Sequence, residues 1–301
     1  MKILLLGKDG QVGWELQRAL APLGEVIALG RDGRAAEGLC GDLTRLDALA
    51  ATVRQVHPQV IVNAAAYTAV DQAEQEPELA QRVNGDAPGV LAREAAALGA
   101  WLVHYSTDYV FDGSGERPWR EDDPTGPLSV YGKTKLDGEV QVRGAGCLHL
   151  ILRTSWVYGV RGGNFAKTMV RLASEREQLR VVADQVGAPT GADLIADVTA
   201  HALRHAIRQP EVAGTYHLAA AGETSWHGYA CHVLRQAQAL GQPLKVTAEQ
   251  VEAIATTAWP TPARRPLNSR LDTTRLRHAF HLHLPAWQAG VDRMLQECLA
   301  H

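Results

Sequence analysis

The chain has 301 residues, 46% of them apolar, and its 30 basic and 33 acidic side chains give a formal net charge of −3. This composition is ample for one large domain or two closely packed ones, and it excludes a disordered chain. The charges are balanced and spread along the chain, which argues against nucleic acid or a membrane surface as partner. A small-molecule partner is therefore expected.

The four cysteines lie far apart, at positions 40, 147, 231 and 298, with no C-x-x-C pair. This spacing argues against a zinc site and a disulfide framework, and it favours a reducing, cytoplasmic setting. The apolar run after Met1 is too short for a signal peptide, and no stretch reaches the roughly 18 apolar residues of a membrane span. A soluble, cytoplasmic protein is therefore expected.

Short apolar runs alternate with amphipathic stretches through the first half of the chain. Strands are predicted at residues 2–6, 25–29, 59–63, 101–106 and 148–153, and helices from about 10, at about 44–57, at 88–99, around 131 and from about 285. Continuous apolar strands separated by helices indicate a parallel sheet covered on both faces. We therefore expect an α/β fold with a Rossmann-type doubly wound parallel sheet.

Three glycines, Gly7, Gly10 and Gly13, stand between the first predicted strand and the first predicted helix. In this context glycines permit a tight turn and let backbone N–H groups reach a pyrophosphate at the helix N-terminus, where the dipole favours negative charge. The turn, with Gln11 and Val12 inside it, therefore predicts a dinucleotide cofactor.

Two further segments are expected to complete the cofactor site. Ala65 and Ala66 follow the third predicted strand, where small side chains would let the nucleotide lie against the sheet edge. Asp42 and Leu43 are placed to meet the adenine ring.

The choice between the two nicotinamide cofactors depends on the end of the second predicted strand. There an acidic residue would bind a ribose 2′-hydroxyl, whereas an arginine would accommodate a 2′-phosphate. Arg31 favours NADPH, but Asp32 follows it directly, so the use of NADH stays open.

Tyr131 and Lys135 are four residues apart, so in a helix their side chains leave the same face one turn apart. A fixed ammonium beside a phenol favours the phenolate and lowers its pKa. Thr107 follows the fourth predicted strand, at the edge where such sheets bind ligands. We expect Thr107 to polarise a carbonyl, Tyr131 to protonate it, and Lys135 to hold the nicotinamide ribose and lower the tyrosine pKa.

The alternation of strands and helices loosens after about residue 155. We expect residues 1–155 to form an NAD(P)-binding domain and residues 156–301 to form mainly a smaller C-terminal substrate-binding domain. The chain is expected to return to the first domain around residues 190–220.

Seven blocks across almost the whole chain resemble those of the dTDP-4-dehydrorhamnose reductase family, in the extended short-chain dehydrogenase/reductase superfamily. They are GKDGQVGWEL from Gly7, VNAAAYTAVD from Val62, YSTDYVF from Tyr105, VYGKTK from Val130, RTSWVY from Arg153, DQVGAPTG from Asp184 and RPLNSRL from Arg265. The resemblance implies NAD(P)H-dependent reduction of the 4-keto group of dTDP-4-dehydro-L-rhamnose to dTDP-L-rhamnose, a donor for cell-surface sugars such as lipopolysaccharide O-antigen.

The resemblance also implies roles for individual residues. It implies sugar contacts by Thr107, Asp108 and Trp156, and positions near the cofactor for Ala66, Tyr67, Thr68 and Tyr105. It further implies a homodimer, and a Mg²⁺ ion between the subunits bound by Glu15, Asp193 and Glu297. The residues do not indicate which nucleotide the substrate carries. Pro262, Arg264 and Arg265 are candidates for a diphosphate contact, and an equal alternative is that they form only an exposed, proline-bounded loop.

Two other functions stay open at this point. Nucleotide-sugar dehydratases and epimerases share the fold and the Tyr-x-x-x-Lys pair, but dehydration calls for a Thr-Asp-Glu sequence, and here Tyr109 follows Thr107-Asp108. Epimerisation is less cleanly excluded. The regulatory β subunit of methionine adenosyltransferase resembles this family as a non-catalytic binding partner, and the intact Thr107, Tyr131 and Lys135 set weighs against that reading.

Overall fold

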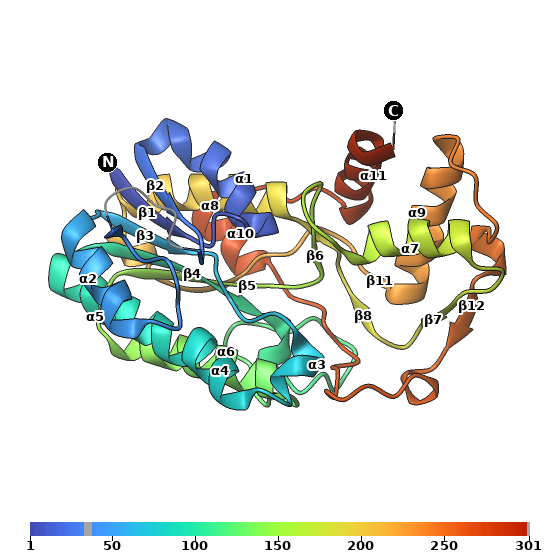
Figure 1. Ribbon diagram of the computed structural model, residues 1–301, viewed down its shortest axis with the longest axis horizontal. Coiled ribbons are helices and arrows are strands. Elements are labelled where there is room, and N and C mark those ends of the chain that lie inside the picture. Colours follow the sequence, from blue (N-terminus) through green and yellow to red (C-terminus); the bar gives the residue numbers. More distant parts are fainter. Residues whose placement is uncertain (33–37, 300–301) are drawn as a thin grey trace.

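The computed structural model describes residues 1–32 and 38–299. Its centre is a six-stranded sheet in the order β10-β5-β4-β3-β1-β2, with every neighbouring pair parallel (Figure 1). The strands are β1 (Lys2–Leu6), β2 (Glu25–Leu29), β3 (Val60–Asn63), β4 (Trp101–Thr107), β5 (His149–Thr154) and β10 (Gly214–His217). The sheet confirms the predicted Rossmann-type α/β class.

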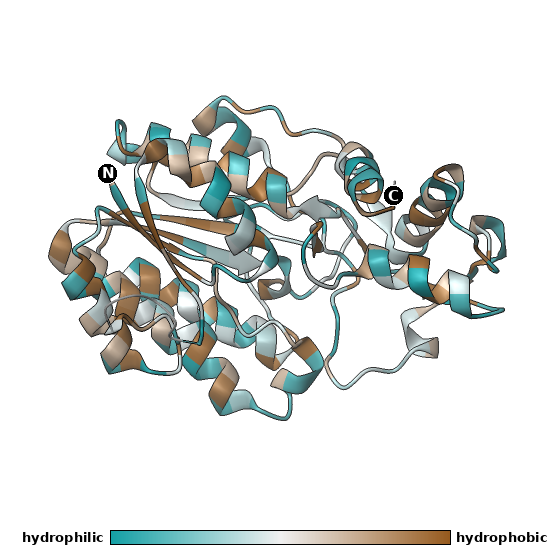
Figure 2. Cartoon of the chain, turned by 45° about the horizontal axis from the view of Figure 1, so that its top comes forward, coloured by the Kyte–Doolittle hydropathy of each residue, from teal (hydrophilic) through white to brown (hydrophobic). Residues whose placement is uncertain are grey.

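Helices cover both faces of this sheet. One face carries α1 (Gln11–Leu20), α8 (Ala192–Ala206) and α10 (Thr274–Phe280), and the other carries α2 (Leu46–Val56), α5 (Ala87–Leu98) and α6 (Val130–Gly144). Because side chains of a strand alternate between faces, Ile3 and Leu5 pack into the first core while Leu4 and Leu6 pack into the second. The first strands are consequently rich in apolar residues, and brown strands stand out in Figure 2.

The segment between β3 and α5 is built from short helical pieces. These are α3 (Val70–Ala73), α4 (Pro77–Gln81) and a π-helical turn at Arg82–Asp86. The predicted helix at 88–99 corresponds to α5, which ends at Gly99 in a left-handed cap with φ of 64°. A π-helical turn of this kind is common near functional sites, and this one packs against α6.

The rest of the chain packs around a separate hydrophobic core, away from the central sheet, at the right of Figure 1. Its helices are α7 (Phe165–Glu175), α9 (Trp226–Ala239) and α11 (Trp287–Leu299). Six short strands pair two by two: β6 (Val157–Tyr158) with β9 (Thr190–Gly191), β8 (Val186–Gly187) with β11 (Thr224–Ser225), and β7 (Arg180–Val182) with β12 (Glu252–Ile254). Within the described residues, no helix is long and apolar enough to cross a membrane.

The chain returns to the central sheet twice after β5, first at α8 and β10 and again at α10. After β9 it runs back along the sheet as α8, which packs against α1, and then enters the sheet as β10 beside β5. On these contacts we propose the division at residue 155, with a return at about 190–220.

Candidate active site

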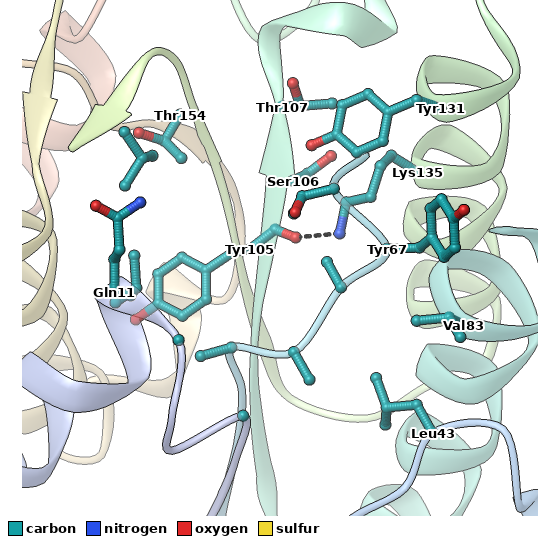
Figure 3. Close-up of a pocket in the computed structure, with 18 of the residues that line it drawn as sticks. Gln11, Leu43, Tyr67, Val83, Tyr105, Ser106, Thr107, Tyr131, Lys135 and Thr154 are labelled. Carbon is teal, nitrogen blue, oxygen red and sulfur yellow. Dashed lines mark hydrogen bonds between the residues drawn. The ribbon is translucent and has the colours of Figure 1, made fainter. Parts of the chain in front are cut away.

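A cavity of about 700 Å³ lies at the carboxyl ends of the sheet strands. Its walls come from the turn after β1, the ends of β2, β3, β4 and β5, the first turns of α6, and Trp226 at the start of α9. Figure 3 shows these side chains converging from both sides of β4. The cavity therefore lies where ligands bind in sheets of this topology.

The glycine turn shapes one wall of the cavity. Gly7 has φ of +85°, and a Cβ there would lie 2.6 Å from the backbone nitrogen of Ala65. Gly10 caps α1 without a side-chain hydrogen bond, so the free N–H groups of the first turn remain available to an anion. Gly7, Gly10, Gln11 and Val12 all line the cavity.

Gly13 is the one predicted cofactor residue that does not line the cavity. A Cβ on Gly13 would lie 2.0 Å from the carbonyl oxygen of Gly7. The residue instead lets α1 pack directly on the turn, which is a structural reason for glycine at this position.

The remaining predicted cofactor residues from the first three strands also line the cavity: Arg31, Asp42, Leu43, Ala65, Ala66, Tyr67 and Thr68. Arg31 and Asp32 are both exposed at its rim. The Oδ1 atom of Asp42 accepts hydrogen bonds from the backbone and hydroxyl of Thr44, at 2.9 and 2.8 Å. Thr44 is therefore engaged in this turn, and α2 begins at Leu46, two residues after the predicted start at about residue 44.

Asn84 holds the cavity wall near Tyr67 and was not predicted from the sequence. Its Oδ1 accepts from the backbone N–H of Tyr67 at 2.8 Å, and its Nδ2 donates to the carbonyl of Tyr67 at 3.1 Å. The same amide lies 3.2 Å from Thr134 on α6. This link between the loop after β3 and α6 crosses 50 residues of sequence, so no local pattern could reveal it.

The predicted catalytic side chains meet at the centre of the cavity. Ser129 caps α6 by accepting from Gly132 N–H, which places Tyr131 and Lys135 on the helix face turned toward β4. The side chains of Thr107 and Tyr131 both line the cavity and lie near each other in Figure 3. Lys135 donates from Nζ to the carbonyl of Tyr105, drawn as a dashed line in Figure 3.

The expected lowering of the Tyr131 pKa is not observed. Burial raises the pKa of Tyr131 to about 12, and the nearby Thr107 hydroxyl opposes this shift only in part. Lys135 is turned toward the Tyr105 carbonyl and so does not counter the cost of ionising the phenol. In this arrangement Tyr131 is a fully protonated donor at neutral pH.

Asp108 lies beside this pair at the start of a short 3₁₀ turn, η4 (Asp108–Val110). Thr107 donates to its Oδ1 at 3.1 Å, and its Oδ2 has no hydrogen-bond partner among the described residues. Burial raises the pKa of Asp108 to about 6. A buried, half-satisfied carboxyl on the cavity wall is suited to meet a ligand hydroxyl.

Trp156, the third predicted sugar contact, has an unusual backbone and an aromatic partner. Its φ is +49°, a conformation that costs a bulky residue energy, and its ring stacks on Trp226 with centroids 3.8 Å apart. Both rings line the cavity. Trp226 was not predicted from the sequence because it opens a helix 70 residues away and carries no local signal.

The magnesium ligands implied by the resemblance do not form a complete site within one chain. The described residues contain no group of three or more His, Cys, Asp or Glu side chains that could hold a metal. Glu15 pairs with Arg18, whereas Asp193 and Glu297 both pair with Arg293, at 3.9 and 2.9 Å. Each carboxylate has an arginine as counter-charge, so the residues of one chain do not fit the ion by themselves.

The three candidates for a diphosphate contact also lie apart from the cavity lining. Pro262 and Arg264 are exposed. Arg265 binds both oxygens of Asp71, at 3.0 and 2.8 Å, and this pairing occupies its guanidinium. The geometry thus favours the alternative of a proline-bounded loop for this segment.

A parallel sheet with a glycine turn at its first crossover, and a Thr, Tyr and Lys group above its centre, is characteristic of nicotinamide-dependent oxidoreductases of the short-chain dehydrogenase/reductase class. Within that class the chain belongs to the dTDP-4-dehydrorhamnose reductase family. The model of the family described as RmlD substrate binding domain matches residues 1–300.

Individual relatives agree over nearly their full lengths. A dTDP-4-dehydrorhamnose reductase of Salmonella typhimurium is 57% identical over 99% of this chain and 98% of its own. A solved reductase of this name from Clostridium acetobutylicum has a TM-score of 0.88 at 35% identity, covering 99% of both chains. One from Bacillus anthracis, solved in complex with NADP, has a TM-score of 0.86 at 33% identity, covering 98% of this chain and 99% of its own.

Proposed function

We propose that the protein uses NADPH to reduce the 4-keto group of dTDP-4-dehydro-L-rhamnose, giving dTDP-L-rhamnose. The observation that carries this proposal is that the hydroxyls of Thr107 and Tyr131 lie near each other at the cavity wall of a chain from this family. Two adjacent hydroxyls can both contact one carbonyl oxygen, which polarises the carbonyl and supplies a proton to it.

The residues of the glycine turn fit a dinucleotide. Positions 7 and 13 leave no room for a Cβ, and the first turn of α1 offers uncapped N–H groups at the cavity. These groups would hold the pyrophosphate. When bound, the reduced nicotinamide supplies the hydride.

Each residue near the carbonyl has a separate task in this proposal. Thr107 orients the substrate oxygen, and Tyr131 gives its phenolic proton to that oxygen as the C–O bond becomes single. Lys135 holds the nicotinamide ribose. Asp108, through its unpartnered oxygen, and Trp156, through its ring, contact the sugar.

NADPH is the proposed cofactor because Arg31 lies at the cavity rim, where it can meet a 2′-phosphate. The relative from Bacillus anthracis was solved with NADP. Asp32 lines the same rim, so NADH remains a second cofactor to be measured.

The test is a coupled assay with authentic dTDP-4-dehydro-L-rhamnose, read at 340 nm, with NADPH and NADH in separate arms. We expect stoichiometric loss of NADPH absorbance and formation of dTDP-L-rhamnose. An epimerase would rearrange the sugar with no net change at 340 nm, and a regulatory subunit would do neither; either result would overturn the proposal.

We also propose that the protein acts as a homodimer in the cytoplasm. Light scattering of the purified chain tests the assembly, and fractionation of cells tests the location. A monomeric mass at assay concentration would contradict the first statement.

A further inference from the structure

His104 is a buried histidine on β4 that connects the sheet to Lys135. Its Nε2 lies 3.4 Å from Nζ of Lys135, and its Nδ1 lies 3.2 Å from Nδ2 of Asn63. Asn63 is its neighbour in register on β3, and both side chains are 1% exposed. A chain of contacts therefore runs from Asn63 through the imidazole to the lysine.

The backbone determines which imidazole nitrogen carries hydrogen. The N–H of Ala65 donates to Oδ1 of Asn63 at 3.3 Å, and a backbone N–H can only donate, so this atom must be the amide oxygen. The atom of Asn63 that faces Nδ1 is then the NH₂ group, also a donor. Nδ1 must accept, and in a neutral imidazole the hydrogen then lies on Nε2, facing Lys135.

The imidazole is neutral. Burial, followed by the charge of Lys135, lowers the pKa of His104 well below its usual value. An Nε2–H that faces an ammonium group places two donors together, whereas the lone pair of a neutral amine can accept this N–H. The second hydrogen-bond partner of Nζ, the Tyr105 carbonyl, accepts one amine N–H and leaves the other free for the cavity.

We propose that His104, oriented by Asn63, is a positioning residue that favours the neutral amine of Lys135, so that this lysine changes its protonation state within the working pH range. The inference rests on the proposed function, because it concerns the lysine assigned to the nicotinamide ribose. It adds a residue that neither touches the substrate nor lines the cavity.

The surroundings of Lys135 are consistent with this assignment. Burial lowers the pKa of Lys135 to about 8, and the charge of Glu139, one turn further along α6, opposes the shift. Other titratable groups on the elements packed here are Tyr105 on β4, Tyr131, Lys133 and Asp137 on α6, Asp108 and Tyr109 on η4, and Tyr67 in the loop after β3. Tyr131 and Tyr67 have pKa values raised to about 12, so they do not ionise in the same range.

The kinetic test compares His104→Gln and His104→Leu with the wild type in pH profiles of kcat/KM. On the alkaline side of the profile, kcat/KM is expected to fall as Lys135 loses its proton; this fall is the alkaline limb. The carbonyl of Gln can reach the Nε2 position and accept from an ammonium group, so we expect the alkaline limb of His104→Gln to move up by about one pH unit. His104→Leu removes the facing N–H and should move the limb upward by less. A downward shift in either variant would mean that Nε2 accepts from Lys135, and it would overturn the proposal.

His217→Gln is the matched control, because His217 is a fully buried histidine on β10 of the same sheet, outside the cavity lining. It should lower the melting temperature and leave the alkaline limb in place. His104 variants that behave in the same way, with lower melting temperatures and no shift of the limb, would assign His104 a packing role only.

A second readout does not depend on activity. In protein labelled with ¹⁵N-histidine, the ring resonances lost in His104→Gln identify His104, and we expect its hydrogen on Nε2. Hydrogen on Nδ1 would overturn the inference. If the wild type shows the expected tautomer but oxidises neither cofactor with the keto-sugar, the proposed function fails while the tautomer assignment stands.

Discussion

Tyr131 holds its proton because it is buried, and this sets how the proposed reaction depends on single side chains. A phenol with a pKa of about 12 stays protonated throughout the neutral range. Proton delivery then depends on the negative charge that develops on the substrate oxygen as the carbonyl is reduced. Tyr131 is therefore already protonated when the substrate binds.

Replacing the phenol tests this directly. Tyr131→Phe removes the proton donor but keeps the ring, so kcat should fall by roughly 10²-fold or more with a smaller change in KM. Tyr216→Phe, whose hydroxyl donates to the carbonyl of Val212 outside the cavity, is the control and should retain its activity. Near-normal turnover by Tyr131→Phe would contradict the assigned role.

Arg31 is the residue on which cofactor choice is expected to depend. In Arg31→Glu the 2′-phosphate of NADPH would meet a carboxylate, and the KM for NADPH should rise roughly 10-fold or more, as expected for loss of a charge-assisted hydrogen bond. The KM for NADH should change far less. Steady-state kinetics with both cofactors measures the two values, and equal effects on both would remove Arg31 from this role.

Asp108 should make stability depend on pH in an uncommon direction. Burial raises its pKa from 3.8 to about 6, so between these values the folded protein binds a proton that the unfolded chain has lost. Raising the pH through this window therefore destabilises the fold. Relative to wild type, Asp108→Asn should gain on the order of 2 kcal/mol in free energy of unfolding between pH 4 and pH 7.

Urea denaturation at the two pH values measures this difference. Asp112→Asn is the control of opposite sign, because hydrogen bonds from Ser114 hold the pKa of the exposed Asp112 carboxyl below its usual value. That variant should lose stability relative to wild type as the pH rises. A constant difference between Asp108→Asn and wild type would show that the carboxyl titrates normally.

At the scale of elements, a buried ion pair joins α6 to β5. Arg153 donates to both oxygens of Glu139 at 2.8 and 2.7 Å, and the two side chains are 3% and 0% exposed. Despite its burial, Glu139 has a pKa below its usual value because Arg153 compensates the charge. The pair fixes the helix that carries Tyr131 and Lys135 against the strand beside the cavity.

Breaking this pair should be costly. Glu139→Gln leaves the buried guanidinium without a counter-charge and should lower the free energy of unfolding by about 3 kcal/mol. Glu175→Gln is the matched control, since its partner Arg171 and Glu175 itself are both exposed on α7, and it should cost less than about 0.5 kcal/mol. If chemical denaturation shows that Glu139→Gln and Glu175→Gln lose the same free energy of unfolding, burial does not make the Glu139–Arg153 pair more important for stability.

The strands were predicted nearly to the residue because each contains a short apolar run. Residues 2–6 and 25–29 match β1 and β2, the predicted 101–106 ends one residue before β4 does, and the predicted 148–153 is displaced by one residue from β5. Such runs are a local property of the chain. The short α3, α4 and π-helical turn were missed because four or five residues carry no measurable period.

Site residues were predictable where a motif carried them and unpredictable where tertiary contacts placed them. Thr107, Tyr131 and Lys135 stand in recognisable spacing, and the cavity brings them together. His104, Asn84 and Trp226 reach the same region from β4, from the π-helical turn and from α9, through partners far away in sequence. The pKa of Tyr131 was misjudged for the same reason, since burial is not visible in the spacing of two residues.

At the scale of the whole molecule, the carboxylates that resemble magnesium ligands lie on three helices, α1, α8 and α11, and all pair with arginines. Treatment with EDTA should therefore leave both the reduction rate and the mass of the assembly unchanged. Dialysis against EDTA, followed by the coupled assay and light scattering, measures both. A loss of rate that Mg²⁺ restores would show that a second subunit completes an ion site.

The return of the chain through α8 and β10 determines how the molecule can be divided. An open reading frame cut after residue 155 would encode five of the six central strands, leaving the edge of β5 unpaired and the apolar side of α1 uncovered. Such a fragment would be prone to self-association rather than to independent folding. Gene fusions or shuffled chimaeras that exchange the sugar-binding half must therefore keep both residues 192–217 and α10 with the recipient, so a single crossover does not suffice.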